Sequence, residues 1–133
     1  MMLPKGTIIA VADGEKLSLF RNVGDDAGLK LAALPAPSID AEGGTSGGRQ
    51  SSPGNPDTGQ VDEDQFSGGV VEYLNQQALT GEIAKLVIVS APRALGEMRK
   101  HYHKALSAIL QGEIAKDLTG HSMLDIEKAV RAA

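Results

Sequence analysis

The sequence contains no cysteine, which excludes disulfide bonds, thiolate metal sites and cysteine nucleophiles. Tryptophan is also absent, and only two Phe and two Tyr occur in 133 residues. A stacking surface for single-stranded nucleic acid needs aromatic side chains, so this composition disfavours one. Leu, Ile, Val and Ala must fill the core, which is typical of a layered α/β domain.

Basic residues are not in excess either. Seventeen acidic and thirteen basic residues give a formal net charge of −4, which opposes non-specific attraction of the whole molecule to phosphate backbones. No apolar run approaches the ~20 residues of a membrane-spanning helix, and residues 1–6 lack the apolar centre of a signal peptide. We therefore expect no membrane insertion and a cytoplasmic location.

The chain length and an apolar fraction of 41% suit one domain with one core, spanning residues 1–133. The organising stretch is residues 86–96, an apolar run that ends in Ser90-Ala91-Pro92 and then becomes amphipathic. Such a run predicts the central strand of the sheet, buried on both faces. Pro92 suits the first turn of a following helix, because it has no amide proton to leave unbonded.

The other elements are read from periodicity and turn residues. Residues 7–12 and 17–20 predict an antiparallel hairpin through Asp13-Gly14, and residues 29–34 predict a weaker third strand. Asp62 and Gln65 have capping-box spacing, which predicts that a helix begins at Asp62 and ends near Gly81. After Pro92 the pattern predicts a second helix, which is interrupted near residues 101–103. A strand over 113–118 and a helix over 123–130 follow, and the predicted order is βββαβαβα.

Residues 42–60 are rich in Gly, Ser and Pro and contain almost nothing to bury. Ordering such a segment costs about 1–2 kcal/mol per residue in backbone entropy, so we expect a flexible loop. Long loops of this kind are either functional or tolerated insertions, and the tolerated insertion is favoured here.

Several motifs carry a resemblance that runs nearly from end to end. They are Val11-Ala12-Asp13-Gly14, Leu19-Phe20-Arg21-Asn22, Gly48-Arg49, the stretch from Leu86 to Arg99, and Lys116-Asp117-Leu118-Thr119. In these the chain resembles the bacterial host attachment protein family, which is itself similar to the middle domain of archaeal and eukaryotic peptide-chain release factors. The resemblance implies a three-layer α/β fold around a mixed five-stranded sheet, of the ribonuclease-H-like kind.

In release factors, the loop before the first long helix carries a Gly-Gly-Gln tripeptide that positions water against peptidyl-tRNA. The corresponding place here holds Gly47-Gly48-Arg49-Gln50, in which an arginine interrupts the motif. Gln50 is therefore a weak catalytic candidate, and a solvated loop is the favoured interpretation.

Asp13 is a second weak catalytic candidate, because ribonuclease-H-like nucleases carry a magnesium-binding aspartate on the first strand. Its position beside Gly14 favours a role as a turn former. His101, His103 and His121 lack the spacing of a helical zinc site, so we expect no metal. No phosphate-binding glycine loop is present, and no cofactor is expected.

The local basic excess consists of Arg93, Arg99, Lys100 and Lys104, to which Arg49 adds a cation from the loop. Open α/β sheets often bind ligands beyond the carboxyl ends of their strands, where several of these side chains are expected. The leading hypothesis is a non-catalytic module that binds ribosomal RNA, tRNA or a ribonucleoprotein; an ordinary solvated helix face remains the simpler interpretation of the basic residues. The alternatives are a protein-interaction or regulatory component of attachment to host cells, and a stand-alone hydrolase of peptidyl-tRNA or another ester through Gln50.

Overall fold

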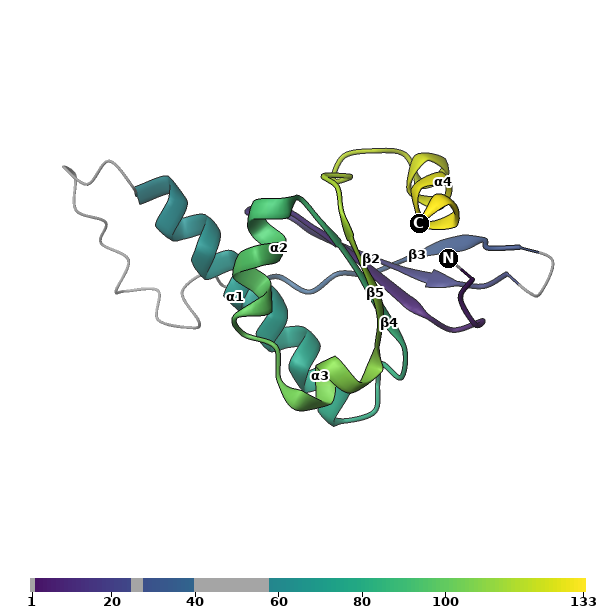
Figure 1. Ribbon diagram of the computed structural model, residues 1–133, viewed down its shortest axis with the longest axis horizontal. Coiled ribbons are helices and arrows are strands. Elements are labelled where there is room, and N and C mark those ends of the chain that lie inside the picture. Colours follow the sequence, from purple (N-terminus) through teal and green to yellow (C-terminus); the bar gives the residue numbers. More distant parts are fainter. Residues whose placement is uncertain (1, 25–27, 40–57) are drawn as a thin grey trace.

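The computed structural model describes residues 2–24, 28–39 and 58–133 (Figure 1). Most of the predicted loop over 42–60, including Arg49 and Gln50, lies outside the described residues. The element order is β1 (Ile8–Ala12), β2 (Leu17–Asn22), β3 (Leu31–Leu34), α1 (Thr58–Leu79), β4 (Leu86–Ser90), α2 (Pro92–Arg99), α3 (Lys104–Ile109), β5 (Leu110–Ala115) and α4 (Met123–Ala132). The predicted order is confirmed, with the interruption at residues 100–103 dividing one helix into α2 and α3.

The five strands form one mixed sheet in the order β3-β2-β1-β4-β5. β2 is antiparallel to β1 and β3, whereas β4 is parallel to both β1 and β5. The prediction that residues 86–90 form the central strand is wrong, because β1 occupies the middle position. Every residue of β1 and of β4 is buried, so burial on both faces does not distinguish the two strands in the sequence.

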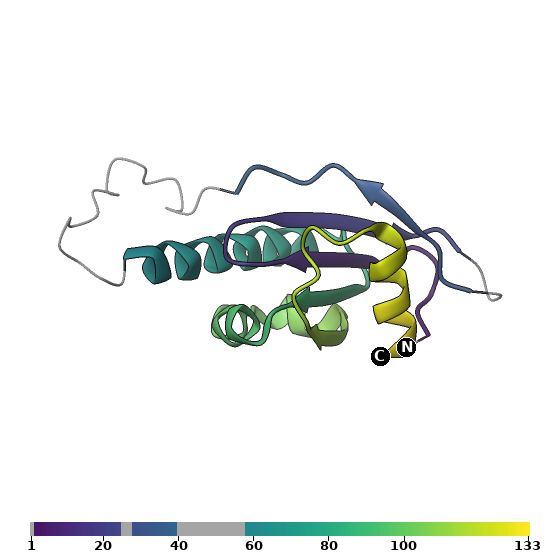
Figure 2. The same ribbon diagram turned by 90° about the horizontal axis from the view of Figure 1, so that it is seen from above.

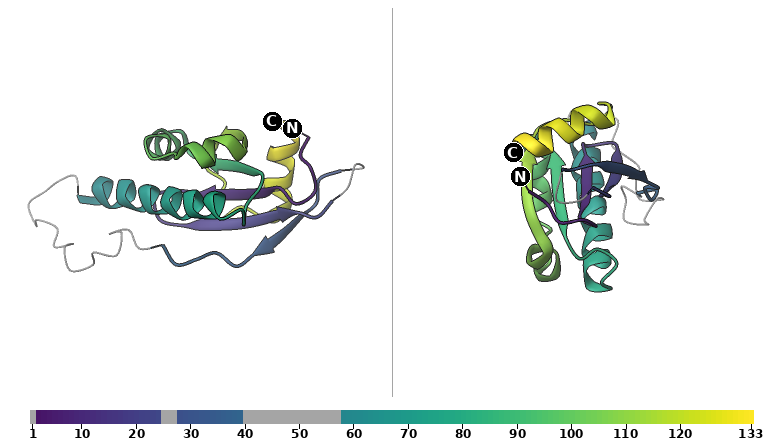
Figure 3. Two further views of the ribbon diagram at one scale, coloured as in Figure 1. Left: turned by 90° about the horizontal axis from the view of Figure 1, so that it is seen from below. Right: turned by 90° about the vertical axis from the view of Figure 1, so that its right-hand side faces the viewer.

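Helices cover both faces of the sheet, which confirms the three-layer α/β architecture. One face packs against α1, α2 and α3, and the buried residues from the helices are Val70, Val71, Leu74, Leu95, Met98 and Leu106. The other face packs against α4 through Ile126 and Val130. Figures 2 and 3 show α2 and α3 one after the other beside α1, with α4 across the sheet. None of the described helices is long and apolar enough to cross a membrane.

Two predicted boundaries are wrong. α1 begins at Thr58 rather than at Asp62, because Gln60 and Val61 do not break a helix and a cap signal does not prevent an additional turn. β5 spans Leu110–Ala115 rather than residues 113–118, because α3 ends at Ile109 and leads directly into the strand.

Asn75 ties α1 to the α2–α3 connection. Its side chain is 5% exposed; its Nδ2 donates to the carbonyl of His101 at 3.1 Å and its Oδ1 accepts from the amide of His103 at 3.0 Å. Asn75 therefore links α1 to the α2–α3 connection through two side-chain hydrogen bonds, in addition to the apolar contacts between these helices.

Candidate functional site: a pocket at the carboxyl ends of β1 and β4

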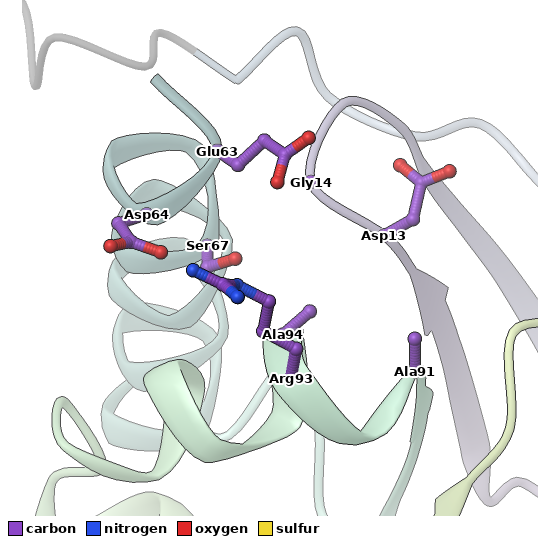
Figure 4. Close-up of a pocket in the computed structure, with 8 residues that line it drawn as sticks. All are labelled: Asp13, Gly14, Glu63, Asp64, Ser67, Ala91, Arg93 and Ala94. Carbon is purple, nitrogen blue, oxygen red and sulfur yellow. The ribbon is translucent and has the colours of Figure 1, made fainter. Parts of the chain in front are cut away.

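A pocket opens where the parallel strands β1 and β4 end. Ala12 and Ser90 are register partners at the last position of each strand, so the residues that follow them diverge from a common edge of the sheet. The cavity measures about 150 Å³. It lies between the β1–β2 turn, the N-terminal part of α1 and the first turn of α2, and its lining residues are Asp13, Gly14, Glu63, Asp64, Ser67, Ala91, Arg93 and Ala94 (Figure 4).

Asp13 forms the turn that borders the pocket. Its Oδ1 accepts hydrogen bonds from the amides of Glu15 at 2.7 Å and Lys16 at 2.6 Å, and its Oδ2 accepts one from Oγ1 of Thr119 at 2.7 Å. Burial acts to raise the pKa of Asp13, but the bond from Thr119 and those from the two amides together lower it below the ordinary value. This geometry is that of the turn former expected from the sequence, while a catalytic role for Asp13 stays a hypothesis.

Gly14 allows α1 to approach this turn closely. A Cβ added at Gly14 would lie 2.6 Å from Cγ and 2.8 Å from Cβ of Glu63, closer than two carbon atoms can pack. The half-buried Glu63 side chain thus rests on the backbone of the turn, and Figure 4 shows it reaching from α1 toward Gly14. Any larger residue at this position would force the turn or α1 to move.

The first turn of α2 forms the opposite wall. Ala91, the N-cap residue, supplies no side-chain hydrogen bond, and Pro92 occupies the first helical position. The amides of Arg93 and Ala94 point out of the helix end with no acceptor within it. Within the described part of the chain, the exposed Arg93 side chain has no hydrogen-bond or ion-pair partner, and Figure 4 shows it extending toward α1.

Two buried hydroxyl groups at this edge of the sheet have no partner among the described residues. Ser67 is 2% exposed and lines the pocket, and its Oγ points from α1 toward the cavity in Figure 4. Ser90 is fully buried, and its Oγ has no hydrogen bond. The Ser90 Oγ is unusual, because its lost hydration is not compensated, whereas the Ser67 Oγ borders the open cavity.

Arg99 lies at the other end of α2 and is held by Glu113 of β5. Its Nη2 and Nε donate to Oε1 of Glu113 at 2.8 and 3.1 Å, and Tyr102 donates to Oε2 at 2.6 Å. The bond from Arg99 lowers the pKa of Glu113, which burial opposes. Burial, and then the bond to Glu113, raise the pKa of Tyr102 above its ordinary value. We refer to Arg99, Tyr102 and Glu113 as the Glu113 brace.

The remaining predicted cations do not converge on the pocket. Lys100 pairs with Glu97 at 3.0 Å, and His101 lies 3.2 Å from the same carboxylate. Lys104 begins α3, where it has no hydrogen-bond or ion-pair partner in the described ranges. Of the predicted binding residues that the structure describes, Arg93 alone lines the pocket. Among the described residues, no group of three or more His, Asp or Glu could hold a metal ion.

The sequence pattern predicts a helix start beside Glu63 and Asp64 but does not indicate that these residues or Ser67 line a site. Their position follows from the direction of the strands. β3 is antiparallel to β2, which is antiparallel to β1, so β3 and β1 run in the same direction. β3 therefore ends at the sheet edge where β1 ends, and the N-terminal part of α1 lies beside that edge, with Glu63 against the turn that holds Asp13 and Gly14.

Comparison with models of known protein families identifies the family of this chain. The model of bacterial archaeo-eukaryotic release factor family 12 matches residues 6–130. The chain belongs to this family. Membership in bacterial archaeo-eukaryotic release factor family 12 confirms the release-factor resemblance, whereas the host-attachment role stays a prediction. No curated protein matches the chain.

Proposed function

We propose that this member of release factor family 12 is a non-catalytic module that binds RNA or a ribonucleoprotein of the translation machinery. Membership in a release-factor-related family is the observation that carries the proposal. Release factors act on ribosome-bound tRNA, so RNA is the partner that the relationship favours. The proposed contact surface comprises three exposed cations of α2, α3 and their connection, which are Arg93, Lys100 and Lys104; we name these three residues the cation row, and Arg93 also lines the pocket.

The members of the cation row differ in their availability to a phosphate. Arg93 and Lys104 have no ion-pair partner among the described residues, so no intramolecular contact must break before they bind. Lys100 must leave Glu97, but its side chain is 70% exposed, and solvent-exposed ion pairs are weak. Arg99 is the least available because Glu113 holds it at two nitrogen atoms.

Sedimentation of the tagged full chain with ribosomal particles tests this function. Phosphate contacts release counterions, so we expect co-sedimentation at low salt and its loss at high salt. The double variant Arg93→Glu/Lys104→Glu should abolish it. Lys128→Glu, which reverses an exposed charge on α4 across the sheet, is the matched control and should bind normally.

Two results would contradict the proposal. If the protein sediments as a small free species at both salt concentrations, a protein partner, as in the host-attachment alternative, is the better account. If ribosome binding survives the double reversal, the cation row is not the contact surface. The hydrolase alternative predicts ester hydrolysis that is lost in Gln50→Ala, and such activity would replace the non-catalytic role.

A further inference from the structure

The pocket carries an inference that does not rest on RNA binding. Its walls differ in chemistry: the first turn of α2 offers hydrogen-bond donors and a guanidinium group, and the facing walls carry the carboxylates of Asp13, Glu63 and Asp64, of which Glu63 has no partner among the described residues. Both kinds of group border one small cavity. We infer that the pocket binds a small zwitterion of the α-amino acid class, with its carboxylate at α2 and its ammonium group at Glu63.

The α2 wall fits a carboxylate. The amides of Arg93 and Ala94 have no acceptor in the helix, and the N-cap Ala91 provides no competing side chain. The positive end of the helix dipole favours an anion at this place. The guanidinium of Arg93 adds a charge that can bind a carboxylate with two parallel hydrogen bonds.

Ser67 is an independent indication of a ligand. It is 2% exposed, lines the cavity and has no hydrogen-bond partner in the described part of the chain. Its Oγ borders the cavity, and no described residue uses its capacity to donate or accept a hydrogen bond. A polar ligand in the cavity would supply the missing bond, as a donor or as an acceptor.

The Glu63 wall argues against an anion alone. Glu63 is half-buried, it rests on Gly14, and its carboxylate has no hydrogen-bond or ion-pair partner among the described residues. A phosphate or a second carboxylate here would be repelled, whereas an ammonium group would be attracted. A ligand that carries both charges satisfies the two walls together.

The size of the cavity limits the ligand further. At about 150 Å³ it is smaller than the roughly 300–1,000 Å³ of sites for drug-sized ligands. A whole nucleotide does not fit inside it. The methyl groups of Ala91 and Ala94 and the backbone of Gly14 leave room for a short side chain beside the two charged ends.

Nuclear magnetic resonance titration of the ¹⁵N-labelled full chain tests the inference. L-Alanine should shift the amide signals of Arg93 and Ala94. Acetate and methylammonium each carry only one of its two charges, so each should bind at least about tenfold more weakly than L-alanine. Ser67→Ala should weaken the binding of L-alanine. Glu63→Gln should weaken the binding of L-alanine by about tenfold and leave the binding of acetate unchanged, because only the contact with the ammonium group is lost.

Glu72→Gln is the matched control, since Glu72 is an exposed glutamate farther along α1, and it should bind like the wild type. The absence of any shift at Arg93 and Ala94 with L-alanine would overturn the inference. So would binding of acetate or inorganic phosphate as tight as that of L-alanine. Because these variants leave Lys104 and Lys100 unchanged, a failure here is distinguishable from a failure of ribosome binding.

Discussion

The two ends of α2 present a contrast within eight residues. At the C-terminal end, polar groups are paired: the Glu113 brace joins Arg99 and Tyr102, and Asn75 binds both the carbonyl of His101 and the amide of His103. At the N-terminal end, Arg93, two backbone amides and the nearby Ser67 have no partner in the described part of the chain. Paired groups hold the fold together, and unpaired groups that border a cavity are available to a ligand.

The largest expected effect is at the paired end. Asn75→Ala removes two hydrogen bonds and leaves a carbonyl and an amide of the α2–α3 connection without partners. We expect the free energy of unfolding to fall by about 2–3 kcal/mol, measured by urea denaturation. Gln76→Ala, at an exposed neighbour, should change it by less than about 0.5 kcal/mol. Equal effects of the two variants would contradict the anchoring role of Asn75.

The Glu113 brace should contribute less, because the Arg99 side chain is 56% exposed. Glu113→Gln should lower the free energy of unfolding by about 1 kcal/mol at neutral pH. The folded-state pKa of Glu113 lies below its unfolded value, so the stabilisation is complete above the unfolded pKa. It is lost as the pH falls through the folded pKa.

Urea denaturation of both proteins across that acidic range checks the pH dependence. The difference between wild type and Glu113→Gln should be largest at neutral pH and should shrink on acidification. If the difference in free energy of unfolding between the two proteins stays constant with pH, the ionised carboxylate of Glu113 is not the source of the stabilisation.

Gly14→Ala probes the packing of the pocket. The added methyl group would overlap Cγ of Glu63, so either the turn or the start of α1 must move, at a cost of about 1 kcal/mol. Gly96→Ala is the matched glycine variant on α2, where a Cβ meets nothing within 4 Å. It should instead stabilise the protein by about 0.5–1 kcal/mol in thermal or urea unfolding. A stabilising Gly14→Ala would show that the close approach to Glu63 is not needed.

Ser67→Ala should have the smallest effect on stability, and it tests directly whether the unpaired groups at the pocket serve a ligand rather than the fold. The hydroxyl has no partner to lose among the described residues, so the free energy of unfolding should stay within about 0.5 kcal/mol of the wild type or rise. The same variant should weaken the binding of L-alanine. A large loss of stability would mean that Ser67 supports the fold, and the contrast with Asn75 would then fail.

Local patterns in the sequence were sufficient for most elements of the fold. The apolar segments and the turn residues around Asp13-Gly14 predict the first hairpin, and the structure confirms it. Boundaries failed where two elements join without a break, as at Ile109, because no proline or glycine marks the change from α3 to β5.

The candidate site was predictable only in part. Asp13 and Arg93 were identified as candidates and both line the pocket, because residues after buried strands gather at the carboxyl edge of a sheet. Arg99 and Lys100 are cations like Arg93, and the structure pairs both with carboxylates. The partner of Lys100 is the nearby Glu97 of α2. Glu113 lies 14 residues from Arg99 along the chain, and this pairing depends on β5 lying beside β4.

Composition and periodicity alone thus determine an α/β chain with the order βββαβαβα, since these properties depend on near neighbours and on which residues avoid water. Tertiary structure decides that β1 rather than β4 is central, that Glu63 packs against the β1–β2 turn at Gly14, and which distant charges are paired. Those outcomes depend on strand order and on helix placement. They bring together atoms far apart in sequence, and no local pattern encodes the distances between them.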